Sequence, residues 1–131
     1  MRFYDVAMAS LAIDAPRKWT DNVLSQHDVA DVVNARRGIA RRIPRLALLR
    51  LALTRELHLA LGMGVRDALA LARALLAADE GTALQRGHVR VHCDRAALEQ
   101  ALDRRLREAL ESAPTPRRGR PPRRRVGDGV K

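Results

Sequence analysis

The chain has 131 residues, which is enough for one small domain, and it carries a formal net charge of +10. Its single cysteine, Cys93, excludes an internal disulfide and fits a reducing cytoplasm. No apolar run approaches the roughly 18 residues that a membrane span needs, and the N-terminal stretch MRFYDVAMASLAIDAP is too polar for a signal peptide, so we expect a cytoplasmic protein without a membrane segment.

The positive charge is concentrated toward the C-terminus. The last 19 residues, after Ser112, hold 7 basic residues and 1 acidic residue, whereas the preceding part holds 18 basic and 14 acidic residues. The scarcity of lysine indicates a GC-rich genome, but that bias does not explain an excess of positive over negative charge. A basic domain with a more basic tail predicts a polyanionic partner: DNA, RNA or an anionic membrane surface. A single Phe, Tyr and Trp offer few stacking platforms for unpaired RNA bases, which favours DNA.

Two short helices are expected at the start of the chain. The stretch YDVAMASLAI predicts a helix over residues 4–13 with Asp5 as its N-cap, and residues 15–24 predict a second helix with Asp14 as its cap and Pro16 in its first turn. Apolar residues recur at helical spacing in both segments: Val6, Ala9 and Ile13, then Trp19, Val23 and Leu24. Helices that meet at Asp14 allow a helix-turn-helix, and Trp19 is expected in the core.

Residues 30–44 break the helical pattern and predict a short hairpin. Asn34 and Gly38 tolerate positive φ, and the segment is rich in β-branched residues: Val32, Val33, Ile39 and Ile43. No acidic residue occurs between Asp31 and Glu56, an interval with seven arginines: Arg36, Arg37, Arg41, Arg42, Arg45, Arg50 and Arg55. Because the planar guanidinium group donates two parallel hydrogen bonds, the Arg pairs that flank the Gly38 turn predict phosphate contacts.

The rest of the domain reads as two helices, a strand pair and a last helix. Pro44 opens a helix that Gly62 ends, with a buried row of Leu46, Leu49, Leu53, Leu57 and Leu61. A second helix starts at Val65 and stops at Gly81, with a buried row of Val65, Leu69, Ala72 and Leu76. Val89 and Val91 then alternate with polar residues, which is strand spacing, and Gly87 is expected to turn a hairpin.

Asp94 is the expected N-cap of the last helix, which runs to Ser112. Leucines recur every four residues along it, at Leu98, Leu102, Leu106 and Leu110. This narrow stripe suits packing on the body of the protein or on a second subunit, and we expect a homodimer through residues 94–112.

Catalytic and metal sites are not expected. His88, His92 and Cys93 are candidate ligands, but on a strand Cys93 faces away from both histidines, so we expect no metal and no cofactor. The helix-surface acids lie beside arginines and read as solvated ion pairs, and no Gly-rich phosphate loop follows a strand. The chain is therefore not expected to be an enzyme.

Two stretches follow the helix pair in order, RRGIARRIPRLALLRLAL and LALGMGVRDALALARALL. Together with the helix pair, they organise residues 4–76 in a way that resembles the DNA-binding domain of MerR-type regulators. That family has a helix-turn-helix, a small wing and two further helices. The resemblance implies that helix 15–24 enters the major groove, with Arg17, Lys18 and Thr20 as contacts, and that the wing binds phosphates through Arg36, Arg37, Arg41 and Arg42. The chain departs from the family in having Ile39 and Ile43 where aromatic residues are usual, and in its short last helix. It is expected to lack a sensor of its own.

The tail contains PRRGRPPRR, which resembles an AT-hook with the core Arg118, Gly119, Arg120 and Pro121. The narrow minor groove of A-tracts attracts arginine, glycine lets the backbone approach the groove floor, and proline keeps the segment extended. The tail is therefore expected either to enter the minor groove or to bind phosphates without sequence choice.

The predicted class is mainly α with small β hairpins: a winged helix-turn-helix, a short strand pair and a C-terminal helix. The predicted divisions are residues 1–79, residues 80–112 as a hairpin and helix for dimerisation, and residues 113–131 as a disordered tail. The predicted function is double-stranded DNA binding by a nucleoid-associated transcriptional regulator. The alternatives are a structural nucleoid protein with little sequence choice and an antitoxin-like or adaptor module. The candidate DNA-binding residues are Arg17, Lys18, Thr20, Asn22, Arg36, Arg37, Arg41, Arg42, Arg118, Gly119, Arg120 and Pro121.

Overall fold

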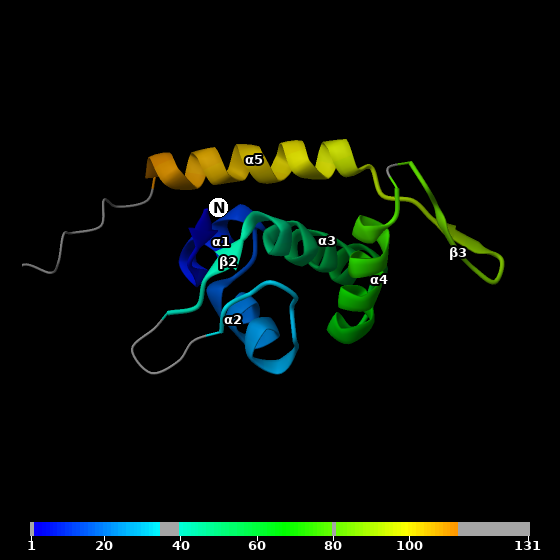
Figure 1. Cartoon of the computed structure of the whole chain (residues 1–131), viewed down its shortest axis with the longest axis horizontal. Helices are drawn as coiled ribbons and strands as arrows, with labels where there is room; N and C mark the ends of the chain where they lie inside the picture. Colours follow the sequence, from blue (N-terminus) through cyan, green and yellow to red (C-terminus); the bar gives the residue numbers. More distant parts are fainter. Residues whose placement is uncertain (1, 35–39, 80, 113–131) are drawn as a thin grey trace, which may run out of the picture.

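A computed structural model describes residues 2–34, 40–79 and 81–112, and within them the chain is mainly helical with two antiparallel strand pairs (Figure 1). The expected fold class, mainly α with small hairpins, is confirmed. The elements in chain order are β1 (Phe3–Tyr4), α1 (Val6–Ala12), α2 (Arg17–Gln26), β2 (Ile43–Pro44), α3 (Arg45–Leu61), α4 (Val65–Ala77), β3 (Leu84–Arg86), β4 (Val89–Val91) and α5 (Arg95–Ser112).

The first helix is shorter than its sequence pattern. Asp5 caps α1 as expected, since its Oδ1 accepts a hydrogen bond from the Met8 amide at 2.8 Å. Tyr4, however, lies in β1 and pairs with Ile43, so the prediction that the helix begins at Tyr4 is wrong. The partner strand is about 40 residues away in the chain. A local pattern cannot reveal such a pairing.

The turn between α1 and α2 differs from the expected capping. Asp14 adopts a left-handed conformation with φ of 56°, and Pro16, not Asp14, is the N-cap of α2. The Ala15 amide donates to the Ser10 carbonyl at 3.0 Å, which closes the turn. The two helices contact each other, so the expected helix pair is present although its second member starts at Arg17.

The expected hairpin is confirmed at its base. Val33 and Arg42 exchange two backbone hydrogen bonds of 2.9 Å, and the second limb continues as β2, which pairs with β1. Among the described residues of this segment, Asp31 has a positive φ of 70°, whereas Asn34 does not use the positive φ that it tolerates. Gly38 and Ile39 lie outside the described residues. We call residues 33–34 and 40–44 the wing base.

Helix α3 is the centre of the core, where it packs against α4, α1 and α5. Leu49, Leu53 and Leu57 are buried as expected, whereas Leu46 (39% exposed) and Leu61 (64% exposed) are not. Leu61 is the last helical residue, and Gly62 turns the chain away at φ of 67°, so no element covers it. Each fully buried leucine stabilises the fold by about 1.5–3 kcal/mol.

The second helix of this pair ends early. α4 closes at Ala77 with Ala78 as C-cap, so the prediction that Gly81 stops it is wrong. Ala72 and Leu76 are buried in the expected row, while Val65 and Leu69 are only partly covered.

Helix α5 lies along the side of the molecule opposite α2 and covers α1 and α3 (Figure 1). The Ala97 amide donates to Asp94 Oδ1 at 3.1 Å, which confirms the cap. Leu98, Leu102 and Leu106 are buried against the chain's own core, and Leu110 is exposed. The stripe therefore packs on the body and is not free for a second subunit. No helix in the described part of the chain is both long and apolar enough to cross a membrane.

Candidate nucleic-acid interface

Helix α2 presents a polar face with three exposed donors. Arg17, Lys18 and Asn22 are all exposed, and their positions fall on one side of the helix. Pro16 has no side chain that can cap the helix, so the positive end of α2 lies directly beside Arg17 and Lys18. The partial positive charge of the helix end and the charges of two flexible side chains therefore lie at the same place.

Thr20 does not belong to this face. It is completely buried, and its hydroxyl donates to the Pro16 carbonyl at 3.3 Å. The expectation that Thr20 contacts DNA is therefore wrong. Thr20 lies three and four residues before the buried Val23 and Leu24, so helical spacing places it on the inward side of α2.

Arg41 joins the wing base to α2. Its Nη1 donates to Asp21 Oδ1 at 2.7 Å and its Nη2 donates to Ser25 Oγ at 3.3 Å, and only 14% of the side chain is exposed. Its guanidinium group is thus hydrogen-bonded within the protein, so Arg41 is a weaker candidate for a phosphate contact than the exposed Arg42. The contact instead compensates the carboxylate of Asp21, the acidic residue of α2.

Arg42 points to the other face of the wing base. Its side chain is exposed, and its guanidinium carbon lies 5.6 Å from the ring centre of Phe3 in β1. The ring restrains the guanidinium group without neutralising it. Arg42 therefore remains available to an external anion.

Three further arginines of the acid-free interval are used inside the protein. Arg50 donates to the Ala30 carbonyl and to Asp31, at 3.0 and 3.2 Å. Arg55 lies over the ring of Trp19 at 4.9 Å, and Trp19 is partly buried and packs against the core. The basic stretch in the sequence is therefore only partly a basic surface.

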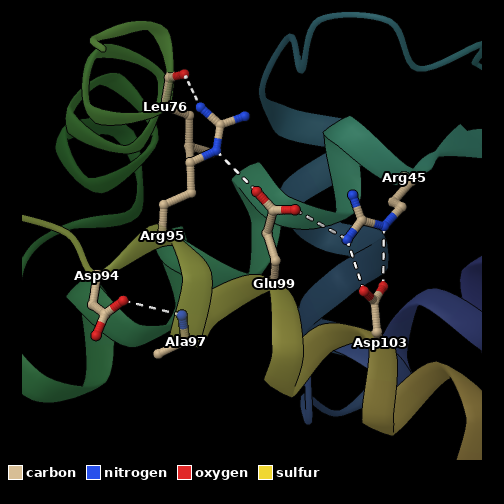
Figure 2. A network of polar contacts seen from close by, with 7 residues as sticks. All are labelled: Arg45, Leu76, Asp94, Arg95, Ala97, Glu99 and Asp103. Atoms are coloured by element: carbon tan, nitrogen blue, oxygen red, sulfur yellow. Dashed lines mark hydrogen bonds and ion pairs between the residues drawn. The ribbon is translucent and has the colours of Figure 1, made fainter. Parts of the chain in front are cut away.

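Arg45 is the third, and it anchors α5 (Figure 2). It makes two parallel hydrogen bonds to Asp103, at 3.1 and 3.0 Å, and a third to Glu99 at 3.3 Å. Burial lowers the pKa of Arg45, but the hydrogen bonds and charges of Asp103 and Glu99 outweigh it and hold the pKa above its ordinary value. The same network continues from Glu99 to Arg95, which donates to the Leu76 carbonyl at the end of α4.

The remaining candidate DNA-binding residues lie outside the described ranges. These are two residues of the wing and four of the tail: Arg36, Arg37, Arg118, Gly119, Arg120 and Pro121. The described candidates that remain exposed are Arg17, Lys18, Asn22 and Arg42.

Cys93 lies in a cavity of about 400 Å³ between α3, α4 and α5, with Glu56 and Asp94 beside it. Burial, followed by these two carboxylates, raises the pKa of the Cys93 thiol, and Arg95 opposes the shift. Within residues 2–34, 40–79 and 81–112, no three His, Cys, Asp or Glu side chains are grouped as a metal site.

Comparisons with known proteins gave no relative. No family model, no curated protein and no solved structure matches the chain. The resemblance to MerR-type regulators therefore stays a hypothesis that depends on the order of its parts.

Proposed function

We propose that the chain is a double-stranded DNA-binding protein, a transcriptional regulator whose helix α2 enters the major groove. The observation that carries the proposal is the exposed set Arg17, Lys18 and Asn22 on one side of α2. These three side chains bond phosphates; arginine and lysine also donate to the acceptor edge of guanine, and asparagine pairs with the donor and the acceptor of adenine. The major groove is wide enough to admit an α-helix.

The charge balance of this face supports the proposal. The only acid within α2 is Asp21, and Arg41 compensates it at 2.7 Å. A phosphate that approaches Arg17 therefore meets no unpaired carboxylate of α2. Arg42, on the wing base, supplies a further exposed charge, and Arg36 and Arg37 precede it in the chain.

In this proposal the tail adds affinity. Its core of Arg118, Gly119, Arg120 and Pro121 either enters an A·T-rich minor groove or binds phosphates. A tethered second contact raises the local concentration of the first. Association with the nucleoid follows from DNA binding.

A homodimer through residues 94–112 has to use the outward face of α5, where Leu110 is exposed. Sedimentation of the wild type and of Leu110→Glu tests this, since a dimer on that face should dissociate in the variant. The adaptor hypothesis loses its support, because the leucine stripe on which it depended is largely buried in the core.

The test is selection of bound duplexes from a random pool with the full chain. The proposal expects an enriched site, loss of the enrichment in Arg17→Ala/Asn22→Ala, and retention of the site with weaker A·T preference in Arg118→Gln/Arg120→Gln. Arg104→Gln/Arg107→Gln, on the exposed side of α5, is the control, and it removes the same charge as the tail variant. Binding without any enriched site would instead identify a structural nucleoid protein, and no binding would refute the proposal.

A further inference from the structure

The β3–β4 pair projects from the body beyond α4, at the end of the molecule away from β1 and β2 (Figure 1). Its strands pair with each other through three residue pairs, and Leu84 and Val91 at its base pack against the core. Beyond that base every residue from Gln85 to Arg90 is exposed. A two-stranded ribbon that projects in this way receives little stabilisation from packing against the rest of the fold.

The exposed part of the ribbon carries one sign of charge. The sequence from Gly81 to Cys93 holds no acidic residue, and its exposed side chains include Arg86, His88, Arg90 and His92. Neither arginine forms an ion pair with any residue in the described part of the chain. The Arg86 guanidinium group donates to the neighbouring Gln85 carbonyl at 3.1 Å.

The strand register sets the direction of these charges. Arg86 is opposite Val89, and Arg90 is opposite Gln85, so the two arginines lie on different faces of the ribbon near its tip. The amide of Gln85 is committed to the Gly87 carbonyl at 3.1 Å, within the turn. The tip therefore offers positive charge on both faces of the ribbon.

We propose that the β3–β4 ribbon is a second DNA-contacting element, which binds the phosphate backbone of duplex DNA through Arg86 and Arg90. A two-stranded antiparallel ribbon fits the major groove, where arginines on both faces meet the phosphates of the two groove walls. Contacts to phosphates carry no sequence information, so the ribbon would add affinity without adding site preference. This inference rests on the proposed function, because it assumes DNA as the partner.

The experiment measures how the affinity of the full chain for a long duplex depends on salt. Arg86→Gln/Arg90→Gln is compared with the wild type and with the control Arg104→Gln/Arg107→Gln, which removes the same charge from the opposite side of the molecule to α2. Each lost phosphate contact lowers the slope of log affinity against log salt by about 0.9, so the ribbon variant should lose roughly 2 in slope. Circular dichroism establishes that the variants are folded.

A slope equal to that of the α5 control overturns the inference and leaves the role of α2 untouched. A different outcome distinguishes this inference from the proposed function. If Arg17→Ala/Lys18→Ala keeps the slope of the control while the ribbon variant loses slope, the proposed role of α2 is refuted and DNA binding by the ribbon is supported. Val89 is 60% exposed at the tip. If Val89→Asp dissociates a dimer and the ribbon charges leave DNA binding unchanged, the ribbon is a contact between copies of the chain and the inference is wrong.

Discussion

Arg41 and Asp21 are joined at 2.7 Å between Nη1 and Oδ1, and this contact ties the wing base to the outward side of α2. Two successive arginines of the wing base, just before β2, thus have different environments. Arg41 is directed to α2, and Arg42 is directed to Phe3 and solvent, because neighbouring residues of an extended segment point to opposite faces.

Substitution of Arg41 should affect the stability of the fold, and substitution of Arg42 should affect DNA binding. Arg41→Ala removes a largely buried guanidinium group with two hydrogen bonds, and it should lower the free energy of unfolding by about 1 kcal/mol, since Asp21 is itself exposed. Arg42→Ala should leave that free energy within about 0.5 kcal/mol and lower the salt slope of DNA binding by about 0.9. Urea unfolding and fluorescence anisotropy measure the two quantities. Equal stability losses in both variants would contradict the assignment.

The Thr20 hydroxyl should be irrelevant to DNA. Thr20→Val keeps the shape of the buried side chain and removes only a long hydrogen bond to Pro16, so we expect a loss of at most about 1 kcal/mol in unfolding free energy and unchanged DNA affinity. Asn22→Ala is the companion variant: it should keep stability and lose site preference. A loss of DNA affinity in Thr20→Val would show that α2 is rotated from its described position.

The bidentate pair of Arg45 with Asp103 should couple the two helices measurably. A double-mutant cycle with Arg45→Ala and Asp103→Ala is expected to give an interaction energy of about 1 kcal/mol, reduced from that of a buried pair because both side chains are partly exposed. The control cycle pairs Arg104→Ala with Asp103→Ala, neighbours on α5 that are not hydrogen-bonded to each other. Its coupling should be close to zero.

The Cys93 thiol should react slowly with alkylating reagents. Its pKa is raised in the folded state, chiefly by burial, so the thiolate forms at higher pH than in an unfolded peptide. For the same reason the unfolded thiol ionises first, and the contribution of Cys93 to stability is lost as pH rises past the ordinary cysteine pKa. Glu56→Gln removes a nearby negative charge, and it should shift the pH profile of iodoacetamide alkylation to lower pH. A rise of the profile in this variant would refute the cause we assign.

Elements defined by short-range rules were predictable. Caps such as Asp5 and Asp94 need only the amide three residues ahead, and the turn at Gly87 needs only a residue that tolerates positive φ. Leucines spaced along α3 and α5 identified helices and most of their buried sides, because helical periodicity is a property of neighbouring residues. The class of fold followed from these local patterns.

The sequence pattern did not predict which partner each polar side chain contacts. The basic interval from Arg36 to Arg55 reads as one surface, yet Arg41, Arg45 and Arg55 each find a partner on another element. Those partners lie 20, 58 and 36 residues away in the chain, and their approach depends on how the helices pack. The charge of each residue and the hydrophobic periodicity of neighbouring residues follow directly from the sequence. The tertiary structure decides which charged side chains remain free for a ligand, because an ion pair forms only where packing brings its two groups within a few ångströms.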